Sequence, residues 1–235
     1  MTAAMGESAR RYARPDTEIV AIEPTWGPES IEGFMEGFLS AAAVLERLAT
    51  YDGEFDAVVM AGYGEPGREG ARELLEVPVF DITESSAHLA CMLGFRYSVV
   101  TTLDRSVPQI EESLRNAGLL EHCASIRATG LGVLEIEQDE GRTRKRMLEE
   151  SRLAISEDRA EVICLGCGGM AGLDKELEAD LGVPVIDGIV AAVKFAEACQ
   201  DYGVRTSKVR SFGSPRPKRI VGWPTSQLSR STDNQ

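Results

Sequence analysis

The side chain best placed for chemistry is Cys167, which follows an apolar run and precedes two glycines. The run, residues 162–166, predicts a buried strand, and Gly168 and Gly169 permit a tight turn with backbone N–H groups that can face an anion. A thiol beside such donors is expected to have its pKa lowered toward neutrality, as a base for an acidic C–H bond requires. We therefore favour a catalytic Cys167 over the alternative of a small buried apolar side chain.

A metal or redox role for the same region is the second interpretation, because Cys164 and Cys167 form a CxxC pattern. The sequence holds no second CxxC, and its two histidines are His88 and His122, which gives poor support for zinc. Cys164 lies inside the apolar run, whereas a redox CxxC usually opens a helix. We expect no metal site and no cofactor, and we expect the remaining cysteines to be buried small side chains. These are Cys91, Cys123, Cys164 and Cys199.

Charge and composition exclude several classes of partner. The 235 residues carry a net charge of −13, which argues against binding a nucleic-acid backbone. No apolar run approaches the length that spans a bilayer, and the first residues lack the apolar stretch of a signal peptide. An odd number of cysteines, five, favours free thiols. We expect a cytoplasmic protein with a small-molecule substrate, and partners that include neither nucleic acid nor membrane.

Apolar strand-like runs alternate with longer amphipathic segments, a pattern typical of parallel sheets covered by helices on both faces. The predicted strands are residues 18–22, 57–61, 79–82, 97–101, 125–128, 162–166 and 185–186. The predicted helices are residues 31–50, 84–93, 107–117, 141–157 and 188–201.

The chain also repeats itself at a spacing of about 106 residues, too long for a solenoid and typical of a duplicated α/β half. The matching blocks are residues 55–64 with 160–169, 77–81 with 183–187, and 90–98 with 198–207. We therefore predict an α/β fold of two pseudo-symmetric, Rossmann-like parallel-sheet lobes. The first comprises residues 1–98 with a C-terminal tail, 206–235, and the second comprises residues 99–205.

Ligands bind beyond the carboxyl ends of parallel strands. In two facing lobes this rule places Gly62 and Cys167, which end equivalent strands, on opposite sides of one cleft. The loop at residues 62–67 contains three glycines, and an anion-binding loop and a purely structural turn are equally compatible with it. Thr101 and Thr102 end another strand, where their hydroxyl groups can contact a ligand or simply favour strand formation.

Several blocks together resemble the hydantoin and allantoin racemases of the cofactor-independent aspartate/glutamate racemase superfamily. The blocks are residues 27–33, 64–67, 98–102, 165–170, 184–187 and 206–208, and the similarity runs over roughly residues 1–223. The resemblance implies two lobes, a cleft between them, no cofactor and a homo-oligomer. It implies that two cysteines face opposite sides of the substrate carbon, with Cys167 in the second position. The residues that we expect to bind the substrate are Pro28, Tyr63, Gly64, Thr101, Thr102, Gly168 and Gly169.

Two departures from the family pattern bear on function. The first cysteine position is occupied by Gly62, which has no side chain to move a proton, so we expect two-base racemisation to be slow or absent. One cysteine also suits an arylmalonate-decarboxylase-like reaction, and half a catalytic pair suits a ligand-binding or inactive relative; both alternatives stay open. The family further begins with a short apolar strand, whereas this sequence starts with what looks like the following helix, an observation compatible with truncation.

Overall fold

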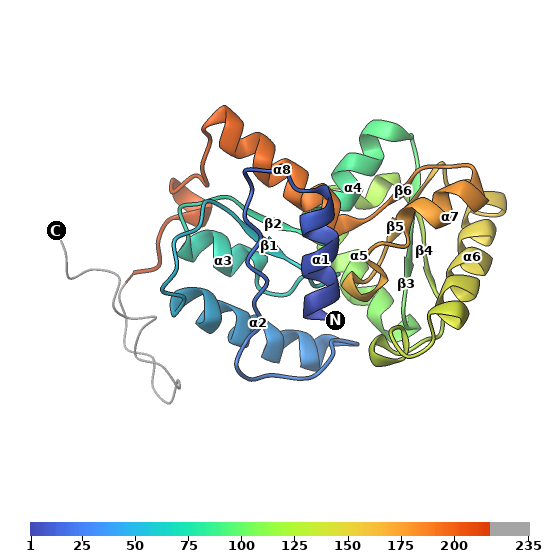
Figure 1. The fold of residues 1–235 in the computed structure, drawn as a ribbon, viewed down its shortest axis with the longest axis horizontal. Helices are drawn as coiled ribbons and strands as arrows, with labels where there is room; N and C mark the ends of the chain where they lie inside the picture. The colour runs from blue at the N-terminus through green and yellow to red at the C-terminus, as the bar shows by residue number, and fades with distance from the viewer. Residues whose placement is uncertain (217–235) are drawn as a thin grey trace.

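The computed structural model describes residues 1–216, so most of the predicted C-terminal tail, residues 217–235, lies outside the described residues. Two lobes stand side by side, each built around a parallel sheet (Figure 1). Within residues 1–216 there are five 3-10 helices, numbered η1 to η5. They are η1 (Asp104–Ser106), η2 (Leu120–His122), η3 (Val133–Glu135), η4 (Gly168–Met170) and η5 (Arg210–Phe212). The predicted fold class is confirmed.

The first lobe contains two paired strands between two layers of helices. Its elements are β1 (Val58–Met60), β2 (Val79–Asp81), α1 (Thr2–Tyr12), α2 (Phe34–Ala49), α3 (Arg68–Leu74) and α8 (Gly188–Tyr202). Successive strand side chains point to opposite faces. Met60 therefore packs with Ala71 of α3, whereas Val59 packs with Ile189 and Val193 of α8. The alternation fixes α2 and α3 on one side of the sheet and α1 and α8 on the other.

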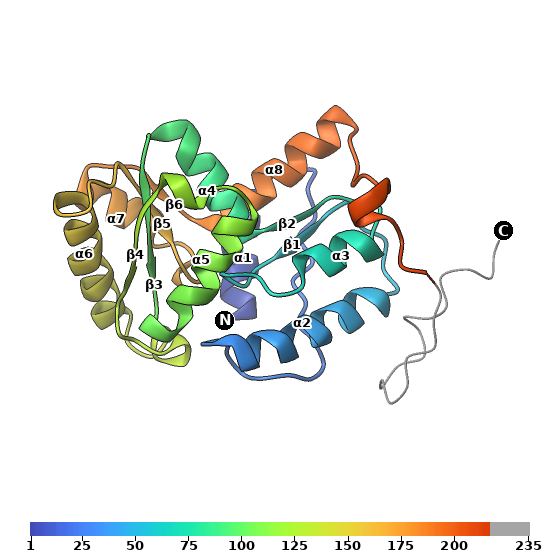
Figure 2. The ribbon, with the colours of Figure 1, turned by 180° about the vertical axis from the view of Figure 1, so that it is seen from behind.

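The second lobe has four parallel strands in the order β4-β3-β5-β6. Its strands are β3 (Tyr97–Thr101), β4 (Cys123–Ala128), β5 (Val162–Leu165) and β6 (Val185–Ile186). Its helices are α4 (Ile82–Leu93), α5 (Val107–Asn116), α6 (Glu140–Ser156) and α7 (Asp174–Leu181). Every residue of β3 and β5 is buried, as expected for central parallel strands covered on both faces. Figure 2 shows α4 and α5 on one face of this sheet, with α6 at the far edge of the lobe.

The sequence repeat corresponds to a repeat in structure. Asp81 ends β2 and caps α4, accepting hydrogen bonds from the N–H groups of Thr83 and Glu84. Asp187, its repeat partner, follows β6 and caps α8 through the N–H of Ile189. Each capping carboxylate satisfies backbone donors that a helix start leaves unpaired. The two capped helices, α4 and α8, pack against each other where the lobes meet.

The predicted strand at residues 18–22 is wrong. This segment is extended but belongs to neither sheet, and a cavity separates it from β1, leaving no strand within hydrogen-bonding reach. The sequence pattern also missed α3 and α7, which have seven and eight residues. Helices of two turns show too few apolar repeats to be recognised by periodicity.

The first residue of α8, Gly188, lies so close to α4 that a Cβ atom there would stand 2.5 Å from the carbonyl oxygen of Ile82. We expect Gly188→Ala to lower the free energy of unfolding by about 1–3 kcal/mol, because the helices must separate to admit a methyl group. Gly141→Ala is the matched control, since a Cβ near the start of α6 meets nothing closer than 3.5 Å. Urea unfolding should show Gly141→Ala unchanged or stabilised; equal stability of the two variants would contradict the argument.

Candidate functional site

A cavity of ≈1260 Å³ opens at the carboxyl ends of β1, β3 and β5. Both lobes line it, the first with Gly62 and the second with Thr101, Thr102 and Cys167. The cavity continues between β1 and the extended segment at residues 17–24. Its position agrees with the rule that ligands bind beyond the carboxyl ends of parallel strands.

The two strand-end turns approach each other closely across this cavity. A Cβ atom at Gly168 would stand 2.7 Å from the carbonyl oxygen of Ala61, which follows β1 in the other lobe. A Cβ at Gly166 would stand 2.8 Å from the carbonyl oxygen of Val100 in β3. Backbone approach at these distances requires glycine. The sequence-predicted pair, Gly62 and Cys167, is therefore brought to one cavity from opposite lobes.

Cys167 precedes η4, and its Sγ accepts a hydrogen bond from the N–H of Gly169 at 3.4 Å. Burial raises the pKa of the Cys167 thiol to about 11, against the lowering effect of that single donor. The negative charges of Glu137 and Glu32 raise this pKa further. The predicted lowering of the pKa toward neutrality is thus wrong, because burial and two carboxylates outweigh one N–H group. At neutral pH the side chain is a thiol.

Cys164 and Cys167 do not form one site. Cys164 is fully buried in the core beneath α4 and α5, and this burial raises its pKa. Cys167 packs on the opposite side of β5, with residues of the α6 and α7 layer. The five cysteines are all free thiols. Within residues 1–216, no three His, Cys, Asp or Glu side chains gather in a way that could hold a metal ion.

Polar groups of the loop after β1 form hydrogen bonds with side chains of α4. The N–H of Gly64 donates to Thr83 Oγ1 at 2.7 Å, and Gly64 has φ +83°. The hydroxyl group of Tyr63 pairs with Ser86 Oγ at 2.9 Å, and burial raises the Tyr63 pKa. Tyr63 lines the cavity, whereas Gly64 does not. Substrate binding by these two residues stays a prediction.

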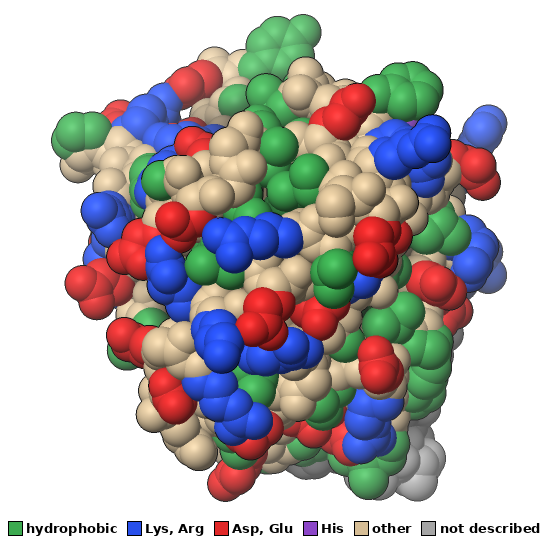
Figure 3. Space-filling view, turned by 90° about the vertical axis from the view of Figure 1, so that its right-hand side faces the viewer, with side chains coloured by type: hydrophobic (Ala, Val, Ile, Leu, Met, Phe, Trp, Pro, Cys, Tyr) green, Lys and Arg blue, Asp and Glu red, His purple; other side chains and the backbone are tan. Residues whose placement is uncertain are grey.

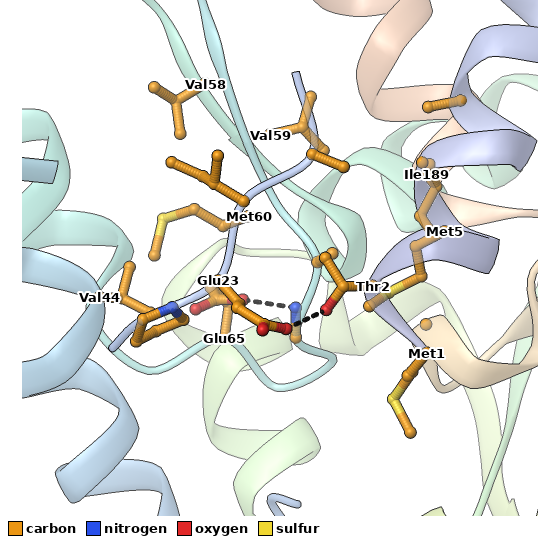
Figure 4. Close-up of a pocket in the computed structure, with 18 of the residues that line it drawn as sticks. Met1, Thr2, Met5, Glu23, Val44, Val58, Val59, Met60, Glu65 and Ile189 are labelled. Carbon is orange, nitrogen blue, oxygen red and sulfur yellow. Dashed lines mark hydrogen bonds between the residues drawn. The ribbon is translucent and has the colours of Figure 1, made fainter. Parts of the chain in front are cut away.

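A buried carboxyl group in this loop was missed by the sequence reasoning. Glu65 is 8% exposed, lines the cavity, and its Oε2 accepts a hydrogen bond from the N–H of Gly62 at 2.9 Å. Burial raises its pKa well above the ordinary value, and the negative charge of Asp81 adds to the rise. Figure 4 shows Glu65 across the cavity from Met1 and Met5 of α1. The available signal was a carboxylate inside a glycine-rich, strand-end loop.

The two predicted threonine hydroxyl groups, of Thr101 and Thr102, differ in their hydrogen bonding. Thr101 donates its hydroxyl proton to the carbonyl oxygen of Gly166 at 2.9 Å, which binds the end of β3 to the end of β5. Thr102 is also buried and lines the cavity, and within residues 1–216 its hydroxyl group makes no hydrogen bond. Thr102 is therefore the freer of the two to contact a ligand. In the turn after β5, Gly168 lines the cavity, whereas the N–H of Gly169 is used by Cys167.

The segment containing Pro28 runs along the cavity and then binds the second lobe. Pro28 lines the cavity, and the Glu32 carboxylate accepts a hydrogen bond from the N–H of Val133 at 2.9 Å. Ser106 donates its hydroxyl proton to the carbonyl oxygen of Glu32 at 3.1 Å. This first-lobe segment thus spans the cleft.

The surface of the second lobe carries intermixed charges. In Figure 3, acidic and basic side chains alternate over the face formed by α6 and α7. Arg144 on α6, for example, forms ion pairs with Glu176 and Asp180 on α7. No helix in the described part of the chain is both long and apolar enough to cross a membrane. The view shows no continuous basic surface of the kind that nucleic-acid binding requires.

The family model described as Asp/Glu/Hydantoin racemase matches residues 1–196. The chain belongs to this racemase family. A hydantoin racemase from Pseudomonas sp. (strain NS671) is 44% identical over 94% of this chain and 90% of its own. An allantoin racemase structure from Pseudomonas fluorescens is 54% identical, with a TM-score of 0.92 over 94% of each chain. One from Klebsiella pneumoniae is 38% identical, with a TM-score of 0.93 over 97% of this chain and 94% of its own.

The raised pKa of Cys167 predicts how its alkylation depends on pH. With a pKa of about 11, about one thiol in ten thousand is ionised at pH 7, and this fraction grows about tenfold per pH unit. The iodoacetamide rate at the Cys167 peptide should therefore rise about tenfold per unit from pH 7 to 10. Peptide-resolved mass spectrometry separates it from Cys199, which lies away from the cavity. A plateau near pH 8 would contradict the raised pKa.

Proposed function

We propose that this member of the family is a cofactor-independent racemase of hydantoin-type rings, such as a 5-substituted hydantoin or allantoin. Cys167 is the proton-transferring residue on one face of the C5 carbon. The observation that carries the proposal is a single thiol in the interlobe cavity of a chain 54% identical to an allantoin racemase and 44% identical to a hydantoin racemase.

The chemistry of the ring fits a general acid at this place. Loss of the C5 proton leaves an enolate, because the neighbouring carbonyl group accepts the electron pair. Recovery of the opposite enantiomer then needs a proton delivered to the other face. Cys167, protonated at neutral pH because burial raises its pKa to about 11, is suited to deliver that proton. The Thr102 hydroxyl group, which lines the cavity, is suited to stabilise negative charge on the ring oxygen.

The test is incubation of each enantiomer of a 5-substituted hydantoin, and of allantoin, in heavy water. We expect deuterium at C5, detected by NMR, and a loss of about a hundred- to ten-thousand-fold in Cys167→Ala. Cys199→Ala is the control, since Cys199 lies outside the cavity, and its exchange rate should match the unchanged protein.

Three outcomes would redirect the proposal. Exchange that survives in Cys167→Ala would remove this residue from the chemistry. Carbon dioxide release from an arylmalonate, without exchange on hydantoins, would select the single-cysteine decarboxylase. Ligand binding without either reaction would favour an inactive relative.

We further propose that the protein is a cytoplasmic homo-oligomer. Five free thiols support a reducing compartment. An apolar surface on α2 supports self-association: Phe38 and Met35 are 71% and 66% exposed, and Phe34 stacks on Phe38 at 6.2 Å. Exposed apolar clusters of this kind commonly mark protein interfaces.

The oligomer proposal predicts that Phe38→Glu, which places a charge in this surface, shifts the protein toward monomers in sedimentation velocity. Tyr202→Glu is the matched control, because Tyr202 is also a largely exposed aromatic residue but lies on α8. Identical sedimentation of Phe38→Glu and the unchanged protein would place the interface elsewhere.

A further inference from the structure

The structure assigns to the Glu65 carboxyl group the role of acid/base on the face of the substrate opposite Cys167. This inference rests on the proposed function, and it names the group that performs the second proton transfer of racemisation. Gly62, at the equivalent strand end, has no side chain to do so.

The first observation is the position of the carboxyl group. A Cβ atom built at Gly62 would stand 2.7 Å from Glu65 Oε2. The Glu65 oxygen thus occupies the place where a side chain on residue 62 would begin. The hydrogen bond from the Gly62 N–H, at 2.9 Å, holds Oε2 there. A functional group is therefore present at this strand end although residue 62 does not provide it.

The second observation is that Glu65 and Cys167 line the same cavity from different lobes. Glu65 belongs to the first-lobe loop and faces Met1 and Met5 of α1 across the cavity (Figure 4). The turn containing Cys167 packs against those methionines: a Cβ at Gly168 would meet Met5 Sδ at 2.6 Å. A small ring between the two sides would have the carboxyl group on one face and the thiol on the other.

The third observation is that no cationic side chain among residues 1–216 forms an ion pair with Glu65. Arg68 lies near it but is bound by Asp81 at 2.7 Å and by Glu69 at 2.6 Å. Among residues 1–216, Glu65 forms no ion pair, and its Oε1 accepts no hydrogen bond. Burial raises the pKa of this carboxyl group, which makes its ionised form a stronger base than an exposed glutamate.

The proton transfers balance. The Glu65 carboxylate removes the C5 proton and becomes a carboxylic acid, while the electron pair of the C–H bond moves to the carbonyl oxygen. The Cys167 thiol then delivers its proton to the opposite face of C5 and becomes a thiolate. The opposite enantiomer reacts in reverse, with the thiolate as base and the carboxylic acid as donor, which returns both groups to their starting states.

The test compares Glu65→Gln with the unchanged protein in two assays, racemisation in water and C5 deuterium exchange in heavy water. We expect racemisation to fall about a hundred- to ten-thousand-fold. The rate of C5 deuterium exchange with retention of configuration, on the face that Cys167 reaches, should change by less than about tenfold. Glu76→Gln is the control and should change neither assay, because Glu76 is an exposed carboxylate between α3 and β2 whose side chain forms no ion pair or hydrogen bond among residues 1–216.

Two further measurements distinguish catalysis from a structural role. The double variant Gly62→Cys/Glu65→Gln should regain racemisation, because a thiol on residue 62 restores an acid/base group on that face and the displaced neighbour is a flexible side-chain end. The raised pKa of Glu65 means that its contribution to stability is lost as pH rises through the folded-state pKa. Glu65→Gln should therefore unfold at the same or a higher temperature than the unchanged protein at pH 8.

The outcomes separate this inference from the proposed function. Wild-type racemisation in Glu65→Gln, or an equal loss of racemisation and Cys167-face exchange, would overturn the role of Glu65. Exchange without racemisation in the unchanged protein would also overturn it, while leaving one-base chemistry at Cys167 in place. Neither exchange nor racemisation on any hydantoin or allantoin would overturn the proposed function, and the inference with it.

Discussion

The site depends on one constraint, the close backbone contact between the two lobes. Gly168 approaches the carbonyl group of Ala61, and Gly188 approaches that of Ile82, at distances that leave no room for a Cβ atom. The first contact brings the ends of β1 and β5 together, and the second brings together the starts of α4 and α8. A wider separation would place the functional groups of the two lobes too far apart to reach one carbon atom from both faces. Small residues at the lobe interface thus determine the geometry of the chemistry.

The electrostatics of the cavity follow from the same closure. Burial removes water from Cys167 and Glu65, and both pKa values rise because the charged forms lose solvation. For a thiol this favours the proton donor, while for a carboxyl group it makes the ionised form more basic. A proton transfer through the substrate requires a protonated thiol on one face and an ionised carboxyl group on the other. A pair of cysteines would need one thiol to be ionised, and burial in this cavity raises the free-energy cost of that ionisation.

Much of the fold could be predicted because its signals are local. The apolar runs of β3 and β5 are buried on both faces, and the repeat of Asp81 as Asp187 marked two equivalent helix starts. The segment at residues 18–22 has the apolar character of a strand, but pairing depends on a neighbour that lies across the cavity. A strand is defined by its partner, and sequence alone does not show whether a partner is within reach.

The site could be predicted in position but less well in its properties. The rule for parallel strands placed Cys167 and Gly62 together, because it depends only on strand ends. The pKa of Cys167 was predicted in the wrong direction, since burial, the main cause of its rise, and the nearby charges of Glu137 and Glu32 arise only in the folded chain. Glu65 was missed because its burial depends on tertiary packing, and the sequence does not signal its local hydrogen bond to the Gly62 N–H.

The relation between Gly62 and Glu65 changes the meaning of the departure from the family pattern. A glycine at this position supplies no thiol, but it leaves the space into which the Glu65 oxygen reaches, 2.7 Å from where a Cβ would stand. Any larger residue at position 62 would displace that oxygen and break its hydrogen bond to the backbone. Glycine at position 62 thus allows the carboxyl group of Glu65, three residues away, to face the cavity at the end of β1. In the proposed mechanism, the glycine at position 62 and the acid/base role of Glu65 therefore depend on the same contact.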